Sequence, residues 1–160
     1  MSTLIVSAIL MAVIIIPFLL MRSGIKKHEK ELYAELADLA QKNSTEIGQY
    51  EVLKDIAVAT DKSLEKLFFI HKNEHLATTQ TIDLGIFTTC QLEKAVKVIR
   101  METGDRTIIE KISLLFKSAD RKNQPITLEL FNTDYDSLTL AGELQLAEKW
   151  AALINDRVKA

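Results

Sequence analysis

The segment ELQLAEKWAALIND, residues Glu143 to Asp156, sets the main requirement on the fold of this chain. Its apolar residues recur every three or four positions, which is the period of an α-helix with one buried face. This spacing predicts a helix from about Gly142 to Arg157. The apolar stripe consists of Leu144, Ala147, Trp150, Ala151, Ile154 and Val158. Because the stripe includes a large indole, the helix has to cover another element of secondary structure.

The residues before this helix alternate between apolar and polar, which is the period of a β-strand with one buried face. The pattern predicts six strands. Their inward-facing residues are Val52, Ile56 and Val58; Phe68 and Ile70; Leu76 to Leu84 at even positions; Ile86, Cys90, Leu92, Val96 and Val98; Ile108, Ile112, Leu114 and Phe116; and Ile126, Leu128 and Leu130. Short polar or glycine-containing segments separate the strands, notably residues 101–106 and 118–125. No segment is long enough for a crossover helix, so the sheet is expected to be antiparallel.

A series of antiparallel strands from about Tyr50 to Phe131, followed by a helix with a buried tryptophan, resembles a pleckstrin-homology-like domain. In that superfamily the helix plugs one end of a seven-stranded barrel, and its tryptophan corresponds to Trp150 here. The resemblance implies a mainly β barrel or sandwich capped by the C-terminal helix, with Trp150, Leu144 and Ile154 in the core. A seventh strand would come from splitting residues 86–99 or from residues 133–140.

The resemblance also bears on ligands. Many bacterial members of the superfamily are small membrane-anchored proteins without an assigned activity. Eukaryotic members that bind lipid commonly carry a basic cluster between the first two strands. In the corresponding segment of this chain, DKSLEK, Asp61 and Glu65 offset Lys62 and Lys66. The resemblance therefore implies no phosphoinositide site.

The first residues of the chain have a different composition from the rest. No aspartate, glutamate, lysine or arginine precedes Arg22, although the whole chain contains 20 lysines and arginines and 22 acidic residues. A helix over Thr3 to Met21 would be roughly 28 Å long, close to the hydrocarbon thickness of a bilayer. A secretory signal peptide would need a basic n-region and a small-residue cleavage site, and neither is present. The run therefore predicts a transmembrane anchor, with a buried helix of a globular core as the other alternative.

Four cations follow the predicted anchor: Arg22, Lys26, Lys27 and Lys30. Positive charge remains on the cytoplasmic side of a membrane, so the amino terminus is expected outside and residues 22 to 160 in the cytoplasm. Together with the resemblance to bacterial members of the superfamily, this topology implies a single-pass protein of a bacterial inner membrane. The four cations are also candidates for weak contact with anionic lipid head groups.

Residues 25–43 have the pattern of an amphipathic helix, with Leu32, Leu36, Leu39 and Ala40 on one stripe. This stripe could pair as a short coiled coil with a second copy, pack onto its own domain, or serve as part of a spacer. The predicted organisation is thus an anchor over residues 1–22, a juxtamembrane helix and linker over 23–48, and a pleckstrin-homology-like domain over 49–160.

The stretch FFIHKNEHLA contains His71, Glu74 and His75 in the order H-x-x-E-H, a zinc-protease signature that requires a helix. A hairpin is the competing interpretation. The contiguous apolar run of residues 67–70, the polar residues 72–74 and the β-prone segment after them all favour it. In a hairpin, both histidines would flank the loop on the face opposite the core and be solvated. A zinc hydrolase therefore stays an alternative, and no metal ligand is assigned.

No other stretch carries a catalytic signature. Phosphate-binding glycine loops, G-x-S-x-G motifs and paired carboxylates are missing from the sequence, and the single cysteine, Cys90, is predicted to be a buried core residue. A net charge of -2 argues against binding to nucleic acid. We therefore expect a non-enzymatic binding or scaffolding module without a cofactor, with the lipid bilayer and a protein as partners. Exposed strand edges or a loop end would bind that protein.

An accessory subunit of a larger membrane complex is the other alternative. In that case the predicted anchor would pack against other helices through Ala8 and Ala12, whose small-xxx-small spacing permits close approach.

Overall fold

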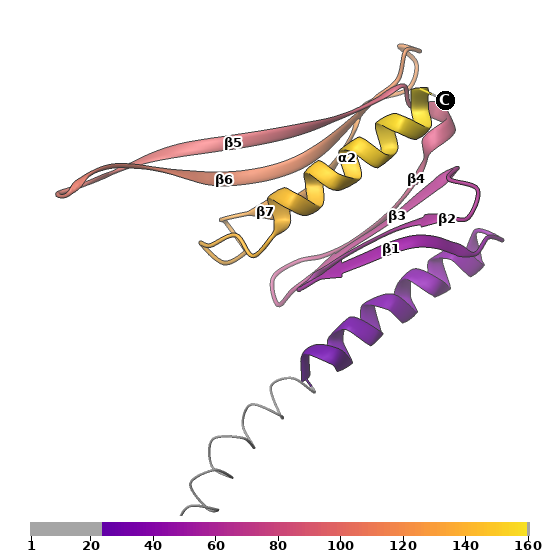
Figure 1. The fold of residues 1–160 in the computed structure, drawn as a ribbon, viewed down its shortest axis with the longest axis horizontal. Helices are drawn as coiled ribbons and strands as arrows, with labels where there is room; N and C mark the ends of the chain where they lie inside the picture. Colours follow the sequence, from indigo (N-terminus) through magenta and orange to yellow (C-terminus); the bar gives the residue numbers. More distant parts are fainter. Residues whose placement is uncertain (1–23, 160) are drawn as a thin grey trace, which may run out of the picture.

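The computed structural model describes residues 24–159, which form two antiparallel β-sheets and two helices (Figure 1). The predicted membrane span, Thr3 to Met21, and the adjacent Arg22 lie outside the described residues. Among residues 24–159, no helix is long and apolar enough to cross a membrane.

The first sheet has four strands in the order β1-β2-β3-β4. Its strands are β1 (Ile47–Leu53), β2 (Ile56–Asp61), β3 (Lys66–Lys72) and β4 (Ala77–Asp83). The prediction of one strand over Val52 to Val58 was wrong, because the chain reverses between Leu53 and Ile56. Lys54 occupies the left-handed region in this turn, with φ 50°. The seventh strand arises here, not from residues 86–99 or 133–140.

The second sheet has three strands in the order β5-β6-β7. A short 3-10 helix, η1 (Leu84–Ile86), leads into β5 (Thr89–Met101), β6 (Gly104–Lys117) and β7 (Ile126–Asn132). All neighbouring strands are antiparallel, as predicted. The expectation of a closed barrel was wrong, because no strand of the first sheet pairs with a strand of the second among residues 24–159. The arrangement is compatible with an open β-sandwich.

Helix α2 (Glu143–Lys159) closes the core between the two sheets (Figure 1). Its buried apolar residues are Leu146, Ala147, Trp150, Ala151 and Ile154. They share one cluster with the inner faces of both sheets, including Phe69 from β3 and Phe116 from β6. Leu144 and Val158 are only partly buried at the margin of this cluster, and Leu146 lies deeper than the sequence pattern indicated. The apolar face of α2 thus covers the inner faces of the two sheets, which do not close on each other.

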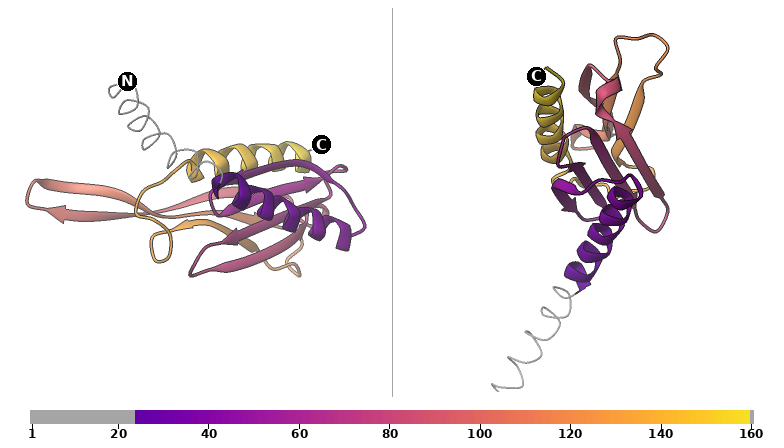
Figure 2. Two further views of the ribbon diagram at one scale, coloured as in Figure 1. Left: turned by 90° about the horizontal axis from the view of Figure 1, so that it is seen from below. Right: turned by 90° about the vertical axis from the view of Figure 1, so that its right-hand side faces the viewer.

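The first helix of the chain, over residues 24–42, covers the outer face of the first sheet (Figure 2). Leu32, Leu36 and Ala40 are buried in a separate cluster with the outward residues of β2 and β3, which are Ala57, Ala59, Phe68 and Ile70. The prediction that Phe68 and Ile70 face the core between the sheets was therefore wrong, because Leu67 and Phe69 face it instead. The two alanines leave room for the helix to approach the sheet closely. The apolar stripe is therefore used within the chain, and β2 is buried on both faces.

The distal parts of β5 and β6 extend beyond the core as a two-stranded hairpin, here called the arm and defined as residues 93–110 (Figure 1). The prediction that Val96 and Val98 face the core was wrong, because they are 61% and 55% exposed. Ile86, predicted on the same face, is also 42% exposed. Strand β7 pairs with β6 only from Lys111 to Phe116, so within residues 24–159 no third strand accompanies the arm.

Asp61 organises the turn between β2 and β3. Its Oδ1 accepts hydrogen bonds from the backbone N–H groups of Glu65 (2.8 Å) and Lys66 (2.9 Å). Its Oδ2 accepts from the hydroxyls of Ser63 (2.6 Å) and Thr45 (3.2 Å). Burial opposes ionisation of this carboxyl, but the four hydrogen bonds outweigh burial and lower its pKa below the ordinary value.

Asp61 should make folding stability depend on acid pH. A lowered folded-state pKa stabilises the protein above the unfolded pKa, and this contribution is lost as the pH falls through the folded pKa. We expect Asp61→Asn to reduce the free energy of unfolding at pH 7 and to reduce it much less at pH 3. Urea titrations of the variant and the wild type at both pH values measure these losses. Glu148→Gln, at an exposed position, is the control and should change the free energy of unfolding little at either pH. An equal loss at both pH values would contradict the assignment.

Trp150 is the largest side chain of the core and is 2% exposed. Among residues 24–159, its Nε1 has no hydrogen-bond partner, so packing is its contribution to stability. We expect Trp150→Ala to lower the free energy of unfolding by about 3 to 5 kcal/mol, because it leaves a cavity between the sheets. Urea unfolding followed by circular dichroism measures the loss. Trp150→Phe should lose clearly less, and an unchanged midpoint for the alanine variant would show that the indole does not hold the sheets together.

Candidate functional site

The H-x-x-E-H residues lie in the hairpin between β3 and β4. His71 belongs to β3, whereas Glu74 and His75 lie in the loop, and the flanking residues Lys72 and Ala77 are cross-strand partners. The predicted hairpin is therefore confirmed. The residues of the signature do not share the face of a helix, which is the arrangement that the zinc-protease chemistry requires.

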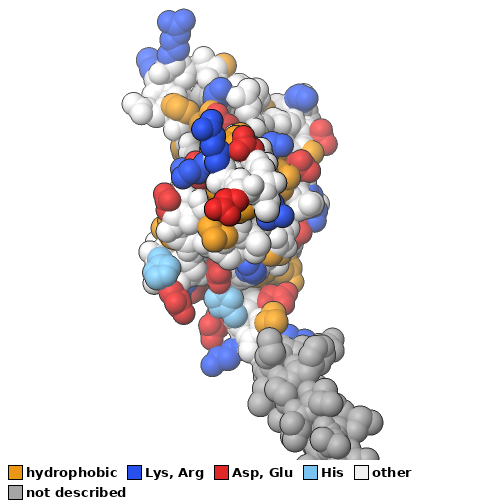
Figure 3. Space-filling view, turned by 90° about the vertical axis from the view of Figure 1, so that its left-hand side faces the viewer, with side chains coloured by type: hydrophobic (Ala, Val, Ile, Leu, Met, Phe, Trp, Pro, Cys, Tyr) orange, Lys and Arg blue, Asp and Glu red, His pale blue; other side chains and the backbone are white. Residues whose placement is uncertain are grey.

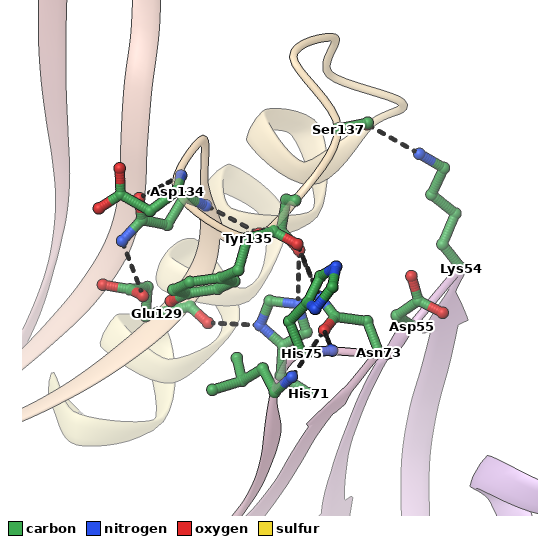
Figure 4. A network of polar contacts seen from close by, with 12 residues as sticks. Lys54, Asp55, His71, Asn73, His75, Glu129, Asp134, Tyr135 and Ser137 are labelled. Atoms are coloured by element: carbon green, nitrogen blue, oxygen red, sulfur yellow. Dashed lines mark hydrogen bonds and ion pairs between the residues drawn. The ribbon is translucent and has the colours of Figure 1, made fainter.

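His71 is buried, with 1% of its surface exposed, so the prediction of two solvated histidines was wrong for this residue. The loop after β7 folds over the face of β3 that had been expected to be open (Figure 4). Nδ1 of His71 lies 3.1 Å from the carbonyl oxygen of Glu129, and Nε2 lies 3.2 Å from Oδ1 of Asp136. The rings of Phe69 and Tyr135 pack edge-on around the imidazole. His75 is exposed, as predicted.

Asp136 is the centre of this polar network, although the sequence pattern did not single it out. Its Oδ1 accepts a hydrogen bond from Nδ2 of Asn73 (2.9 Å), and its Oδ2 accepts one from the backbone N–H of Asn132 (2.8 Å). The network ties the β3–β4 loop of the first sheet to the loop after β7 in the second. Because both ring nitrogens of His71 are engaged within the protein, neither is free to bind a metal or to accept a proton from a substrate.

A cavity of about 240 Å³ lies beside the network. The β1–β2 turn, the β3–β4 loop and the loop before α2 line it, through residues that include Lys54, Asp55, Glu74, Asp136 and Glu143. Within residues 24–159, no group of three or more histidine, cysteine, aspartate or glutamate side chains could hold a metal ion. The polar groups nearest the interior are already paired with one another. The network is therefore best described as a structural connection between the sheets.

Cys90 is buried at the start of β5, with 3% of its surface exposed. Burial raises the pKa of its thiol to about 12, so the thiolate that acts as a nucleophile is scarce at neutral pH. Its backbone N–H donates to Oδ1 of Asn155 (2.9 Å), and its carbonyl accepts from Nδ2 of the same side chain (2.7 Å). An α2 side chain thus occupies the edge of β5 at this position.

The predicted membrane-surface cations lie at the start of the first helix, where Lys26 and Lys30 line one pocket with Tyr50 of β1. Lys26, Lys27 and Lys30 are exposed, whereas Arg22 lies outside the described residues. His28 is nearby, with Nε2 3.2 Å from Oδ1 of Asp55. The three lysines are therefore available to solvent or to lipid head groups, and they alternate with Glu29 and Glu31.

The arm is the second candidate site. Strand β5 is an edge of its sheet, and beyond Cys90 no backbone group within residues 24–159 hydrogen-bonds to its outer side. Val96, Val98 and Met101 expose apolar surface on the arm, where acidic and basic side chains are interspersed. Figure 3 views the molecule from the side toward which the arm points, and this face carries both signs of charge among hydrophobic groups. The unusual length of the alternating pattern, 13 residues in β5 against 7 in β7, was the available sequence signal.

The burial of Cys90 predicts low reactivity. We expect the folded full chain to react with a thiol reagent such as 5,5′-dithiobis(2-nitrobenzoate) at least about 100-fold more slowly than the urea-unfolded chain at pH 8. Absorbance at 412 nm follows the reaction of this single cysteine. Asn155→Ala should speed the reaction because it opens the edge beside the thiol. Equal rates for folded and unfolded protein would show that Cys90 is accessible.

Comparison with known proteins finds no family model that matches the sequence, no curated protein similar to it, and no solved structure similar to its fold. The candidate sites rest on the geometry of residues 24–159.

Proposed function

We propose that this protein is a membrane-anchored, non-enzymatic binding module whose binding surface is the open β5 edge of the arm. One observation carries the proposal: the arm projects from the core with exposed apolar side chains and with a strand edge that no other strand of residues 24–159 pairs with. Unpaired N–H and C=O groups in a row are a template for a further strand, and β-augmentation uses such edges.

The energetics of the arm favour a partner. A two-stranded hairpin without a third strand is marginally stable in water, because neither face is covered. Cross-strand pairs on both faces of the arm combine apolar with polar residues, for example Lys97 with Ile108 and Val98 with Thr107. A strand added to β5 would extend these pairs and bury part of the exposed Val98 and Met101. Such gains are largest where the added strand matches the alternation of the arm.

Anchoring in a membrane is part of the same proposal. The uncharged run Thr3 to Met21 would hold the module at a bacterial inner membrane, with residues 22 to 160 on the cytoplasmic side. Lys26, Lys27 and Lys30 would lie against the head groups. Confinement to a surface raises the effective concentration of a module toward any partner in the same membrane, so a modest edge interaction can suffice. We further propose that the domain is a pleckstrin-homology-like sandwich in which α2 covers the open side.

The proposed absence of catalysis is supported by the state of the reactive side chains. His71 has both ring nitrogens engaged, and Cys90 is buried with a raised thiol pKa. Neither residue is positioned as a base or nucleophile. The H-x-x-E-H residues lie on a hairpin, which gives the zinc-hydrolase alternative no support.

Site-specific photo-crosslinking in membranes tests the binding surface. A benzoylphenylalanine residue in place of Val98 should yield a discrete crosslinked adduct in the membrane fraction, because this position lies on the open edge. The same residue in place of Gln124, exposed in the loop between β6 and β7, is the matched control and should yield none. No adduct at Val98, or equal adducts at both positions, would sink the proposal, and recovery of the full chain in the soluble fraction would sink its membrane part.

A further inference from the structure

The two bonds between Asn155 and Cys90 show which residues of β5 point to the outer edge. Both backbone groups of Cys90 face away from β6, and alternate residues of an antiparallel strand point the same way. The register shift at Ala95 and Val96 places its extra residue, Glu110, on β6, so the alternation of β5 continues through it. The even-numbered residues from Leu92 to Arg100 therefore direct their N–H and C=O groups outward. Val98 lies in the middle of the exposed part of this series. These groups have no partner among residues 24–159.

Asn155 also limits what can pair with β5. Its side chain occupies the edge at Cys90, so an added strand has to end before that point. If the added strand belongs to a second copy of the arm, its hairpin turn at residues 102 and 103 can come no closer to the core than Leu92. This leaves few antiparallel registers in which two β5 edges can pair about a two-fold axis.

Charge distinguishes these registers. Each register is named here by the β5 residue that lies on the two-fold axis. The register centred on Lys97 places Lys97 opposite Lys97 of the other copy and Lys94 opposite Arg100, which is repulsive. The register centred on Arg100 also opposes like charges. A register centred on Ile99 brings no opposite charges together. A register centred on Val98 places the two Val98 side chains together and, on each side of them, sets Lys94 across from Glu102 of the other copy.

We infer that the partner of the β5 edge is a second copy of this chain, paired antiparallel about Val98, so that the two arms form one continuous sheet. The inference rests on the proposed function of this edge and assigns its occupant. Mutual pairing satisfies the outward groups of both copies, buries both Val98 side chains and makes two Lys94–Glu102 ion pairs. The mixed charge of the arm fits a copy of itself better than a uniformly anionic lipid surface (Figure 3).

Exchange of the two charges tests the register. The full chain carries two different affinity tags, is co-expressed and is solubilised in mild detergent; co-purification of the tags and sedimentation measure self-association. Lys94→Glu alone and Glu102→Lys alone should each weaken association about tenfold, because each variant opposes like charges twice. Mixing the two variants should restore association, because one copy then carries acidic side chains at both positions and the other copy carries basic side chains at both. Lys122→Glu, the same charge change in the exposed β6–β7 loop, should have no effect.

Three results would overturn the inference: a monomeric wild-type chain, single variants that associate like the wild type, or a mixture that stays dissociated. Fluorescence of the single tryptophan confirms that each variant is folded. If the wild-type chain is monomeric but its membrane adduct at Val98 has the mass of a different protein, the edge is a binding surface with another occupant and only the second-copy inference fails. If it is monomeric and binds phosphatidylglycerol vesicles through the arm, the occupant is lipid.

Discussion

The fold depends on the burial of one helix face, because the two β-sheets do not close on each other. Each sheet has an apolar inner face, and the sheets share no paired strands among residues 24–159. The apolar residues of α2, with Trp150 at their centre, join the inner residues of both sheets in one cluster. Without this contact, two open sheets would each expose an apolar face to water, which is the largest unfavourable term in such an architecture.

The same principle explains the first helix and the composition of β2. The first sheet has an inner face toward the core and an outer face, and the helix over residues 24–42 covers the outer face. Strand β2 alternates Ile56 and Val58 on the inner face with Ala57 and Ala59 under the helix. Large residues fill the sandwich, whereas small residues set the distance to the helix. The predicted juxtamembrane helix thus packs on the β-sheet through a continuous apolar contact. A membrane anchor continuous with this helix would therefore fix the orientation of the β-sheets relative to the membrane.

The two candidate sites differ in what their polar groups still need. Around His71 and Asp136 the donors and acceptors are paired with one another across the two sheets, so the network is complete without a ligand. Along the arm the opposite holds, because the outward backbone groups of β5 are satisfied at Cys90 by Asn155 and, among residues 24–159, are open beyond it. A surface that lacks partners has more to gain from an added molecule than one that is already satisfied.

The sequence by itself determined the class of secondary structure along most of the chain. The 3.6-residue period located both helices, because it depends on local geometry alone. The two-residue period with its polar turns likewise located the β3–β4 hairpin and the strands after it, but it missed the turn between β1 and β2. Only the tertiary structure decided which apolar faces are buried. His71 is buried because a loop 65 positions away folds over it, and Val96 and Val98 are exposed because β7 ends before it reaches them. Closure of the sheets, the partner of Asp136 and the projection of the arm depend on contacts between distant segments, which no local period encodes.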